Sequence, residues 1–459
     1  MTHQLCEPIL DKGLRNTNFF NGRLLAAEDL RTQQEAERLH RGQLGRALGP
    51  GVVNGLEVQT TPSTDITGSV YGVTIGSGLA INAGGQPLEL PVPVDLALAV
   101  PPTPGAPRAG QFTACATETP LQATGMGMYA LLMAPASGFL QNAPMSGLGA
   151  NGAITGCGAR FQVEGVTFRL ARFDPASLPG LPPTTLSDIN NLMARTNLPD
   201  LRAAPATDQA DLSLLRNRVA HACLGTGQLA VLPMDPLGPQ PHVDRAWDGS
   251  YGALDALTAS GDLTPDDVPL AIVYWTLVGV RFVDMWSLRR RPSRPRSATT
   301  WPALLGDRQR VEAEAMLQQF QQQVDALIAS NLGPTDFSAL RAIDYFRYLP
   351  PAGLLPLGMP GFAGIAPASF FAQQPHREPE FVDERLLRDV LETSLAYDRI
   401  DLASGELIWL YRTWQDAFAA DRGSGGRPYL IFTSGLMPHQ ARARFDLARW
   451  DYSNFVQAD

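Results

Sequence analysis

The sequence has little lysine, little charge overall and no long apolar run. Lys12 is the only lysine, charged residues make up 18% of the 459 residues, and the net charge is −9. No basic tail or stripe is present, which argues against nucleic acid as the main partner. No stretch approaches the roughly 18 uninterrupted apolar residues of a membrane-spanning helix. The low charge fits a fold that hides surface in an assembly, and it equally fits a loop-rich fold.

Cysteine is also scarce, and the spacing of the cysteines does not match a CxxC redox motif or a zinc site. The four residues are Cys6, Cys115, Cys157 and Cys223, with no CxxC pair and no zinc-finger spacing. His221 lies two residues from Cys223, but nothing nearby completes a ligand set. We therefore predict no metal and no cofactor. The opening MTHQLCEPIL lacks the features of a secretory signal, so we expect synthesis in a reducing cytoplasm with free thiols.

Glycine and proline are abundant and spread along the chain, which predicts many turns and ordered loops. There are 43 glycines and 38 prolines. Between them, apolar residues alternate or run continuously, which predicts strands within 52–101 and over 128–134, 161–173 and 271–280. Ala83 to Gly85 is typical of a hairpin turn. The fold class predicted is mainly β with helical elements.

This pattern divides the chain into four regions. Residues 1–50 form an N-terminal arm and helix, and residues 51–175 form a β-sandwich-like domain. Residues 176–223, with helical patches, form a connector. Residues 224–459 form a second mixed β-rich region that includes a long helix over 307–330.

The N-terminal segment is predicted to dock on a partner. Residues 16–23 are polar apart from two phenylalanines, and 26–48 has helical character with acidic residues early and basic residues late. An aromatic arm ahead of a β-domain is suited to docking in a protein interface. The candidate docking residues are Phe19, Phe20, Leu24, Leu25 and Leu30.

The long helix carries a short heptad pattern. Ala313 is followed at spacings of 4, 3, 4 and 3 by the candidate oligomer seam, Leu317, Phe320, Val324 and Leu327. Two interpretations stay open: one helix packed on its own domain, or a helix at an oligomer axis.

Several patterns could carry chemistry, and each has a structural alternative that we favour. The GxGxxG at 147–152 lacks a following helix, and no third residue joins Ser434 and His439 in a triad. The carboxylates of 383–401 could hold a glycosidase pair, but interleaved arginines favour ion pairs. Four tryptophans could form a sugar platform, but core packing fits their apolar strands better. They are Trp275, Trp286, Trp409 and Trp414.

The arginine cluster over 289–296 could bind phosphate or nucleic acid. We favour a structural loop in which these arginines pair with carboxylates. Asp284 could be a buried carboxylate, and we expect its partner to be one of the same arginines.

The opening resembles a known family. The runs NFFxGxLLxAxDLxxxQ over 18–34, GVVxGLxV over 51–58 and GLAIN over 78–82 resemble an N-terminal module of phage-tail-like contractile injection systems. They are also distantly similar to the start of the TssK baseplate family of type VI secretion. The likeness covers roughly a third of the chain and concerns packing and turns.

The resemblance implies a trimeric adaptor whose N-terminal arm plugs into other baseplate or tail proteins. We therefore expect a structural component of a contractile particle, a baseplate subunit or a baseplate-to-fibre adaptor, and not an enzyme. Made in the cytoplasm, it would join a particle that is released or membrane-associated. The alternatives are a carbohydrate- or cell-surface-binding module of the same particle, or a glycoside hydrolase.

Overall fold

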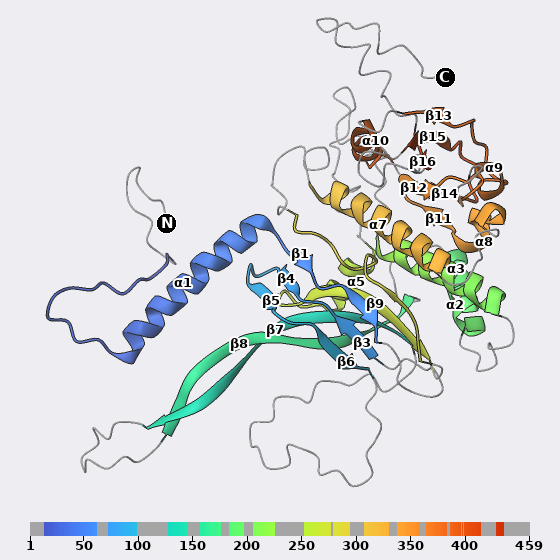
Figure 1. Cartoon of the computed structure of the whole chain (residues 1–459). Coiled ribbons are helices and arrows are strands. Elements are labelled where there is room, and N and C mark those ends of the chain that lie inside the picture. The colour runs from blue at the N-terminus through green and yellow to red at the C-terminus, as the bar shows by residue number, and fades with distance from the viewer. Residues whose placement is uncertain are drawn as a thin grey trace, which may run out of the picture.

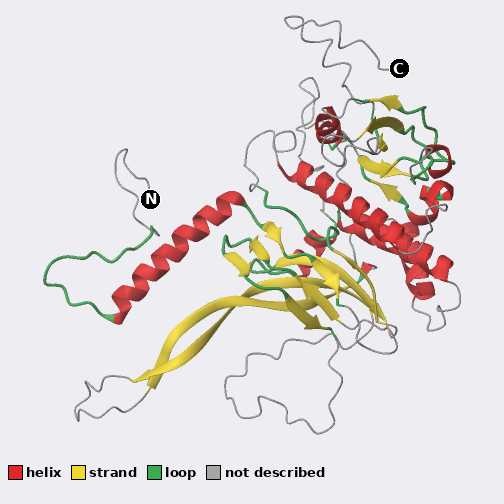
Figure 2. Cartoon of the chain, in the orientation of Figure 1, coloured by secondary structure: helices red, strands yellow, loops and turns green. Residues whose placement is uncertain are grey.

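The structure is a computed structural model of the chain (Figure 1). It describes residues 13–61, 72–98, 127–144, 157–175, 183–196, 205–224, 252–276, 279–293, 307–329, 337–358, 364–382, 386–395, 397, 399–414 and 428–435. Both helices and β-sheets occur in these segments, as Figure 2 shows, and the prediction of a mainly β protein with helical elements is confirmed.

A four-stranded antiparallel sheet lies at the centre, in the order β10-β9-β7-β8. Along β7, Met128, Ala130 and Leu132 enter one core, while Leu131 and Met133 enter another. Because both faces of this strand are buried, its sequence is continuously apolar instead of alternating. The strands are β7 (Gly127–Pro144), β8 (Cys157–Phe173), β9 (Val268–Thr276) and β10 (Gly279–Asp284).

Two three-stranded antiparallel sheets cover one face of this central sheet, in the orders β1-β4-β5 and β2-β3-β6. Val73, Ile75 and Leu88 bring their side chains into the shared core. Gly85, at φ 83°, closes the predicted hairpin between β4 and β5. The strands are β1 (Gly51–Gly55), β2 (Val58–Thr60), β3 (Gly72–Ile75), β4 (Gly78–Ile81), β5 (Pro87–Leu90) and β6 (Val94–Ala97).

Three helices cover the opposite face: α2 (Pro183–Thr196), α3 (Pro205–Cys223) and α5 (Ala253–Ser260). Ile189, Leu215 and Leu257, one from each helix, pack with Tyr274 of β9. The region predicted as a connector therefore contributes two helices to the main core.

A second core lies toward the C-terminal end. Helix α7 (Asp307–Ala329) packs on the sheet β12-β16-β15-β13. The strands are β12 (Ala352–Pro356), β13 (Glu380–Phe381), β15 (Trp409–Trp414) and β16 (Pro428–Thr433). Around them lie the 3₁₀ helix η3 (Phe337–Ala339), α8 (Ala342–Tyr345), α9 (Pro367–Phe370), α10 (Leu387–Ser394), and the pair β11 (Tyr348–Leu349) and β14 (Ile400–Asp401).

The central sheet crosses the region boundaries that the sequence suggested. Its strands β9 and β10 come from beyond residue 224, whereas β7 and β8 come from within 51–175. The two regions are joined because β7 pairs with β9 and because their side chains share one core. The apolar run of β7 is buried only when both edges and both faces of the strand are covered.

Two elements extend away from this body. Helix α1 (Ala27–Leu48) and the outer part of the β7–β8 hairpin both project to one side, at the left of Figure 1. Pairing of β7 with β9 ends at Met133, while β7 continues to pair with β8 as far as Pro144. We call the two-stranded part, residues 135–144 and 157–166, the ribbon.

Candidate docking surface

The N-terminal arm folds back on the first turns of α1, and Asp29 is its anchor. The Thr17 hydroxyl donates to the Asp29 carbonyl oxygen at 2.7 Å, and the Ala26 amide donates to the Asp29 carboxylate at 3.0 Å. Arg23 also pairs with this carboxylate and donates to the Asn18 carbonyl oxygen at 2.6 Å. It therefore links the arm to the start of α1. A carboxylate here also suits the positive end of the helix dipole.

The apolar side chains of the arm point to solvent. Leu24 is 93% exposed, and Phe19, Phe20, Leu25 and Leu30 are all more than half exposed. The Arg23 guanidinium lies 5.8 Å from the ring centre of Phe20. The five predicted docking residues are thus held on an ordered, accessible segment, and their role in docking stays a prediction.

Helix α1 continues this apolar surface. Only Ala36 and Gly45 of the helix are buried, whereas three further leucines are exposed: Leu39, Leu44 and Leu48. A helix with so few buried side chains gains little from its own packing. The sequence predicted a helix here, but these three leucines were not among the predicted docking residues.

The helix is held to the body by small residues and charges. A Cβ atom at Gly45 would lie 2.0 Å from the Gly85 carbonyl oxygen in the β4–β5 turn, so only glycine permits this contact. Arg38 forms an exposed ion pair of 2.5 Å with Glu164 of β8. These contacts fix the direction in which α1 leaves the body.

The ribbon carries a second set of exposed apolar residues, which the sequence analysis missed. They are Phe139, Leu140, Phe161 and Val163, of which Phe139 is 77% exposed. Their signal in the sequence is the alternation of apolar and polar residues over 161–164. The base of the ribbon is anchored where Arg169 of β8 donates to Asp267 at 2.9 Å. Burial opposes ionisation of Asp267, but hydrogen bonds from Arg169 and Thr264 hold its pKa below the ordinary value.

The four seam candidates lie on α7, but three of them are used within the chain. Phe320, Val324 and Leu327 are buried in the C-terminal core, and Leu317 is half-buried. Phe320 packs edge-on against Phe432 of β16, with ring centres 5.2 Å apart. This packing is the alternative left open by the sequence, one helix on its own domain.

Asp284 is buried, as expected, but its partner differs from the expected one. Its carboxylate accepts a hydrogen bond of 2.6 Å from Arg216 of α3, and others from Ser287 and Gln319. The prediction that an arginine of the 289–296 cluster would pair with it was wrong. The reason is that α3 passes directly over β10 and presents Arg216 there.

The arginine cluster is structural over its described part. Arg289 donates to the carbonyl oxygens of Leu56 and Gly55 at 2.9 and 2.5 Å. Two neighbours pair with α7, Arg290 with Glu312 at 2.8 Å and Arg291 with Glu314 at 2.5 Å. The cluster therefore links the β1–β2 region to α7, as the favoured interpretation expected. Positions 294 and 296 lie outside the described residues.

Two of the carboxylates proposed for glycosidase chemistry form ion pairs in the structure. Glu392 pairs with Arg388 and Arg310, and Asp401 pairs with Arg347 at 3.0 Å. Positions 383, 384 and 398 lie outside the described residues. Of the tryptophans, Trp275 is buried, and Trp286 and Trp409 are partly buried in apolar clusters.

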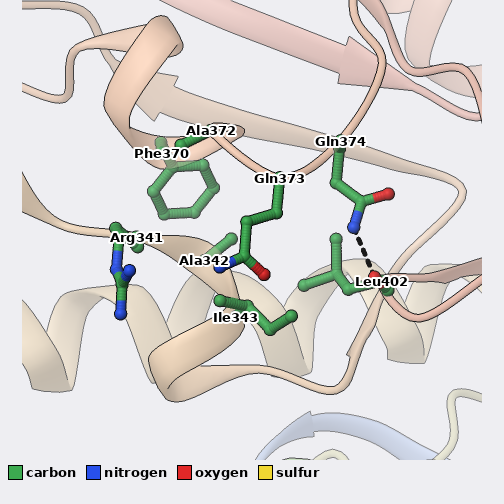
Figure 3. A pocket seen from close by; sticks show the side chains of 8 residues that line it. All are labelled: Arg341, Ala342, Ile343, Phe370, Ala372, Gln373, Gln374 and Leu402. Atoms are coloured by element: carbon green, nitrogen blue, oxygen red, sulfur yellow. Dashed lines mark hydrogen bonds between the residues drawn. The ribbon is translucent and has the colours of Figure 1, made fainter. Parts of the chain in front are cut away.

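A small pocket lies between α8, α9 and the loop that follows β14 (Figure 3). Gln374 closes one side by donating its amide to the Leu402 carbonyl oxygen, and the Arg341 guanidinium is engaged by Asp344. The volume is about 10 Å³, which is the space for roughly one water molecule. It is too small for an organic substrate. The lining residues are Arg341, Ala342, Ile343, Phe370, Ala372, Gln373, Gln374 and Leu402.

Two kinds of feature are absent from the described residues. These residues contain no group of three or more His, Cys, Asp or Glu side chains placed to hold a metal ion. Among the same residues, no helix has the length and apolar character needed to cross a membrane. The GxGxxG segment and His439 lie outside the described part of the chain.

Comparison with known proteins gives little further information. No protein-family model matches the chain, and no curated protein matches it. Six chains of solved structures match, among them one described as the crystal structure of TssK, with 14% identity and a TM-score of 0.20. That match covers 45% of this chain and 54% of the other, so the chain corresponds to about half of that structure's length. A likeness at this level establishes neither the fold nor the function of this chain.

Proposed function

We propose that this chain is a structural component of a contractile, phage-tail-like injection particle, a baseplate subunit or baseplate-to-fibre adaptor that acts by assembly and not by catalysis. The observation that carries the proposal is the exposed apolar arm. Phe20 is 62% and Leu24 93% exposed, on a segment ordered by Asp29. A preorganised aromatic and aliphatic segment is what a protein–protein contact uses as an anchor.

The resemblance of residues 18–34 to the arm of contractile-system proteins supplies the class of partner, which is another baseplate or tail protein. A homotrimer is implied only by that resemblance, because three of the four α7 side chains that suggested an oligomer seam pack inside the chain. An aromatic platform for glycans has no support from the partly or fully buried tryptophans that the structure describes.

The test is co-purification with the assembled particle. Cells that make the particle would carry wild-type protein, the variant Phe19→Ser/Phe20→Ser/Leu24→Ser, or the control Val92→Ser, an exposed apolar residue far from the arm in sequence. We expect the wild type and the control to co-sediment with sheath and tube proteins, and the triple variant to stay soluble and folded but unbound. Absence of the wild-type chain from purified particles would overturn the proposal.

A further inference from the structure

The outer strand of the ribbon is an edge with no partner among the described residues. Strand β8 ends the order β10-β9-β7-β8, and residues 159–165 are exposed on both faces. A Cβ atom at Gly138 or Gly165 would meet nothing within 4 Å. An edge of this length with exposed apolar side chains invites pairing with another strand.

The sequence of this edge is complementary to itself. If two copies of β8 run antiparallel about an axis at Gln162, position 160 of each copy lies opposite position 164 of the other. Arg160 then faces Glu164 twice, and Phe161 faces Val163 twice. Opposing residues on antiparallel strands have Cβ atoms about 4.5–5.5 Å apart, close enough for both kinds of pair to form.

No neighbouring register achieves the same match. A shift of one residue sets Phe161 against Gln162 and Arg160 against Val163. A shift of two residues sets Phe161 against itself or against Gly165, and Glu164 against Gly158 or Gln162. Register is therefore specified by charge and by apolar contact together. The pairing is also consistent with a two-fold symmetric dimer, in which the same surface patch of both copies forms the interface.

The apolar face of the ribbon would become continuous in such a pair. Leu140 lies opposite Phe161 within the chain, and Gly138 lies opposite Val163. Joining two β8 edges therefore places Leu140, Phe161 and Val163 of both copies on one face of a four-stranded sheet. Arg160, Gln162 and Glu164 lie on the other face, where Glu164 also contacts Arg38 of α1.

We propose that the β8 edge over residues 159–165 is a homotypic docking site, and that its occupant is the same edge of a second copy of this chain, antiparallel and centred on Gln162. The inference is independent of the proposed particle function, because it rests on the edge and its charge pattern alone.

The test uses charge reversal with rescue. Light scattering should give the full-length chain a mass near twice 49.5 kDa. Arg160→Glu or Glu164→Arg alone places like charges opposite each other twice, and we expect the dimer Kd to rise about tenfold or more. An equimolar mixture of the two variants restores both opposite-charge pairs and should dimerise as the wild type does. Glu406→Arg, the same charge change on an exposed turn, is the control.

A cross-link gives a second readout. Gln162→Cys places two thiols on the axis at a Cα separation that a disulfide can span, so mild oxidation should yield a covalent dimer. Wild type and Gln59→Cys, at an exposed position of β2, should not. Three outcomes would each overturn the proposal. They are a monomeric wild type, a dimer that both charge variants leave unchanged, and a mixture of the two variants that fails to dimerise.

Discussion

At the scale of single residues, the most constrained group is the buried ion pair between α3 and β10. The side chain of Asp284 is 1% exposed and that of Arg216 is 9% exposed. Gln319 of α7 also donates to this carboxylate at 3.0 Å, so one buried charge contacts both α3 and α7.

Removing that carboxylate should be strongly destabilising. Asp284→Ala leaves Arg216 buried without its counter-ion, and we expect a loss of about 3–5 kcal/mol in the free energy of unfolding. Urea denaturation followed by circular dichroism would measure it. Asp344→Ala, which removes an exposed pair with Arg341, should leave the unfolding curve close to wild type. Equal effects of the two variants would contradict the assignment.

His221 makes stability depend on pH. Burial, aided by the nearby Arg399 charge, holds the pKa of His221 well below its ordinary value. Its ring packs on Tyr348 with centres 5.2 Å apart, and neither ring nitrogen has a hydrogen-bond partner among the residues that the structure describes. Below about pH 6.5 the unfolded chain binds a proton that the folded chain does not.

The sign follows from this difference in bound protons. Stability contributed by neutral His221 is present above about pH 6.5 and falls as the pH drops, by up to about 1.4 kcal/mol per pH unit. Denaturation between pH 7.5 and 5.0 should show this slope in the wild type and a shallower one in His221→Phe. Equal slopes in the wild type and in His221→Phe would contradict this role of His221.

At the scale of elements, α1 depends on a backbone contact that only glycine permits. Gly42 and Gly45 both face the β4–β5 turn, but a Cβ atom would lie 3.5 Å from the Gly84 oxygen at Gly42 and 2.0 Å from the Gly85 oxygen at Gly45. The same substitution should therefore have opposite effects at the two positions.

Alanine favours a helix over glycine by about 1 kcal/mol in an open helical position. We expect Gly42→Ala to be neutral or stabilising, and Gly45→Ala to detach α1 from the body despite its higher helix propensity. Limited trypsin digestion would show this, because Arg41 and Arg46 flank the contact. Faster cleavage of Gly42→Ala than of Gly45→Ala would be evidence against this packing.

Several element positions followed from the sequence because one periodicity applied along the element, whereas the single strand predicted over 271–280 is the end of β9 and the start of β10. The helix over 307–330, the hairpin at 83–85 and the helices within 176–223 were all predicted near their observed places. The β7 half of the ribbon was not, because it contains Pro135, Gly138 and Pro144, residues typical of loops, whereas most of the β8 half lies within the strand predicted over 161–173. An exposed two-stranded ribbon tolerates them, since they need no neighbour beyond one partner strand.

At the scale of the whole molecule, the partners of each element could not be obtained from one sequence. Pairing of β9 with β7 and of Asp284 with Arg216 joins segments more than 60 residues apart. Local patterns carry no record of such contacts. For the same reason the heptad on α7 indicated an apolar face correctly, but could not show whether that face meets its own core or a second chain.

The docking surface followed from the sequence in part. Phe19 and Phe20 stood out because apolar residues in a polar segment are unusual, and the structure leaves them exposed. The leucines of α1 and the ribbon residues required knowledge of which helix face and which strand edge stay uncovered. These exposed groups lie on the arm, on α1 and on the ribbon, and the last two project from the body (Figure 1).

Docking of the N-terminal arm is tested most directly by amide hydrogen exchange over residues 16–30. The exchange rates are compared between the free protein and the assembled contractile particle. In the free chain the arm makes few backbone hydrogen bonds, among them Arg23 to Phe20 at 3.2 Å, so its amides should exchange quickly. If the arm docks on a partner, this segment should be strongly protected in the particle, with little change in the β7–β9 core. Equal, fast exchange of the arm in both states would contradict it.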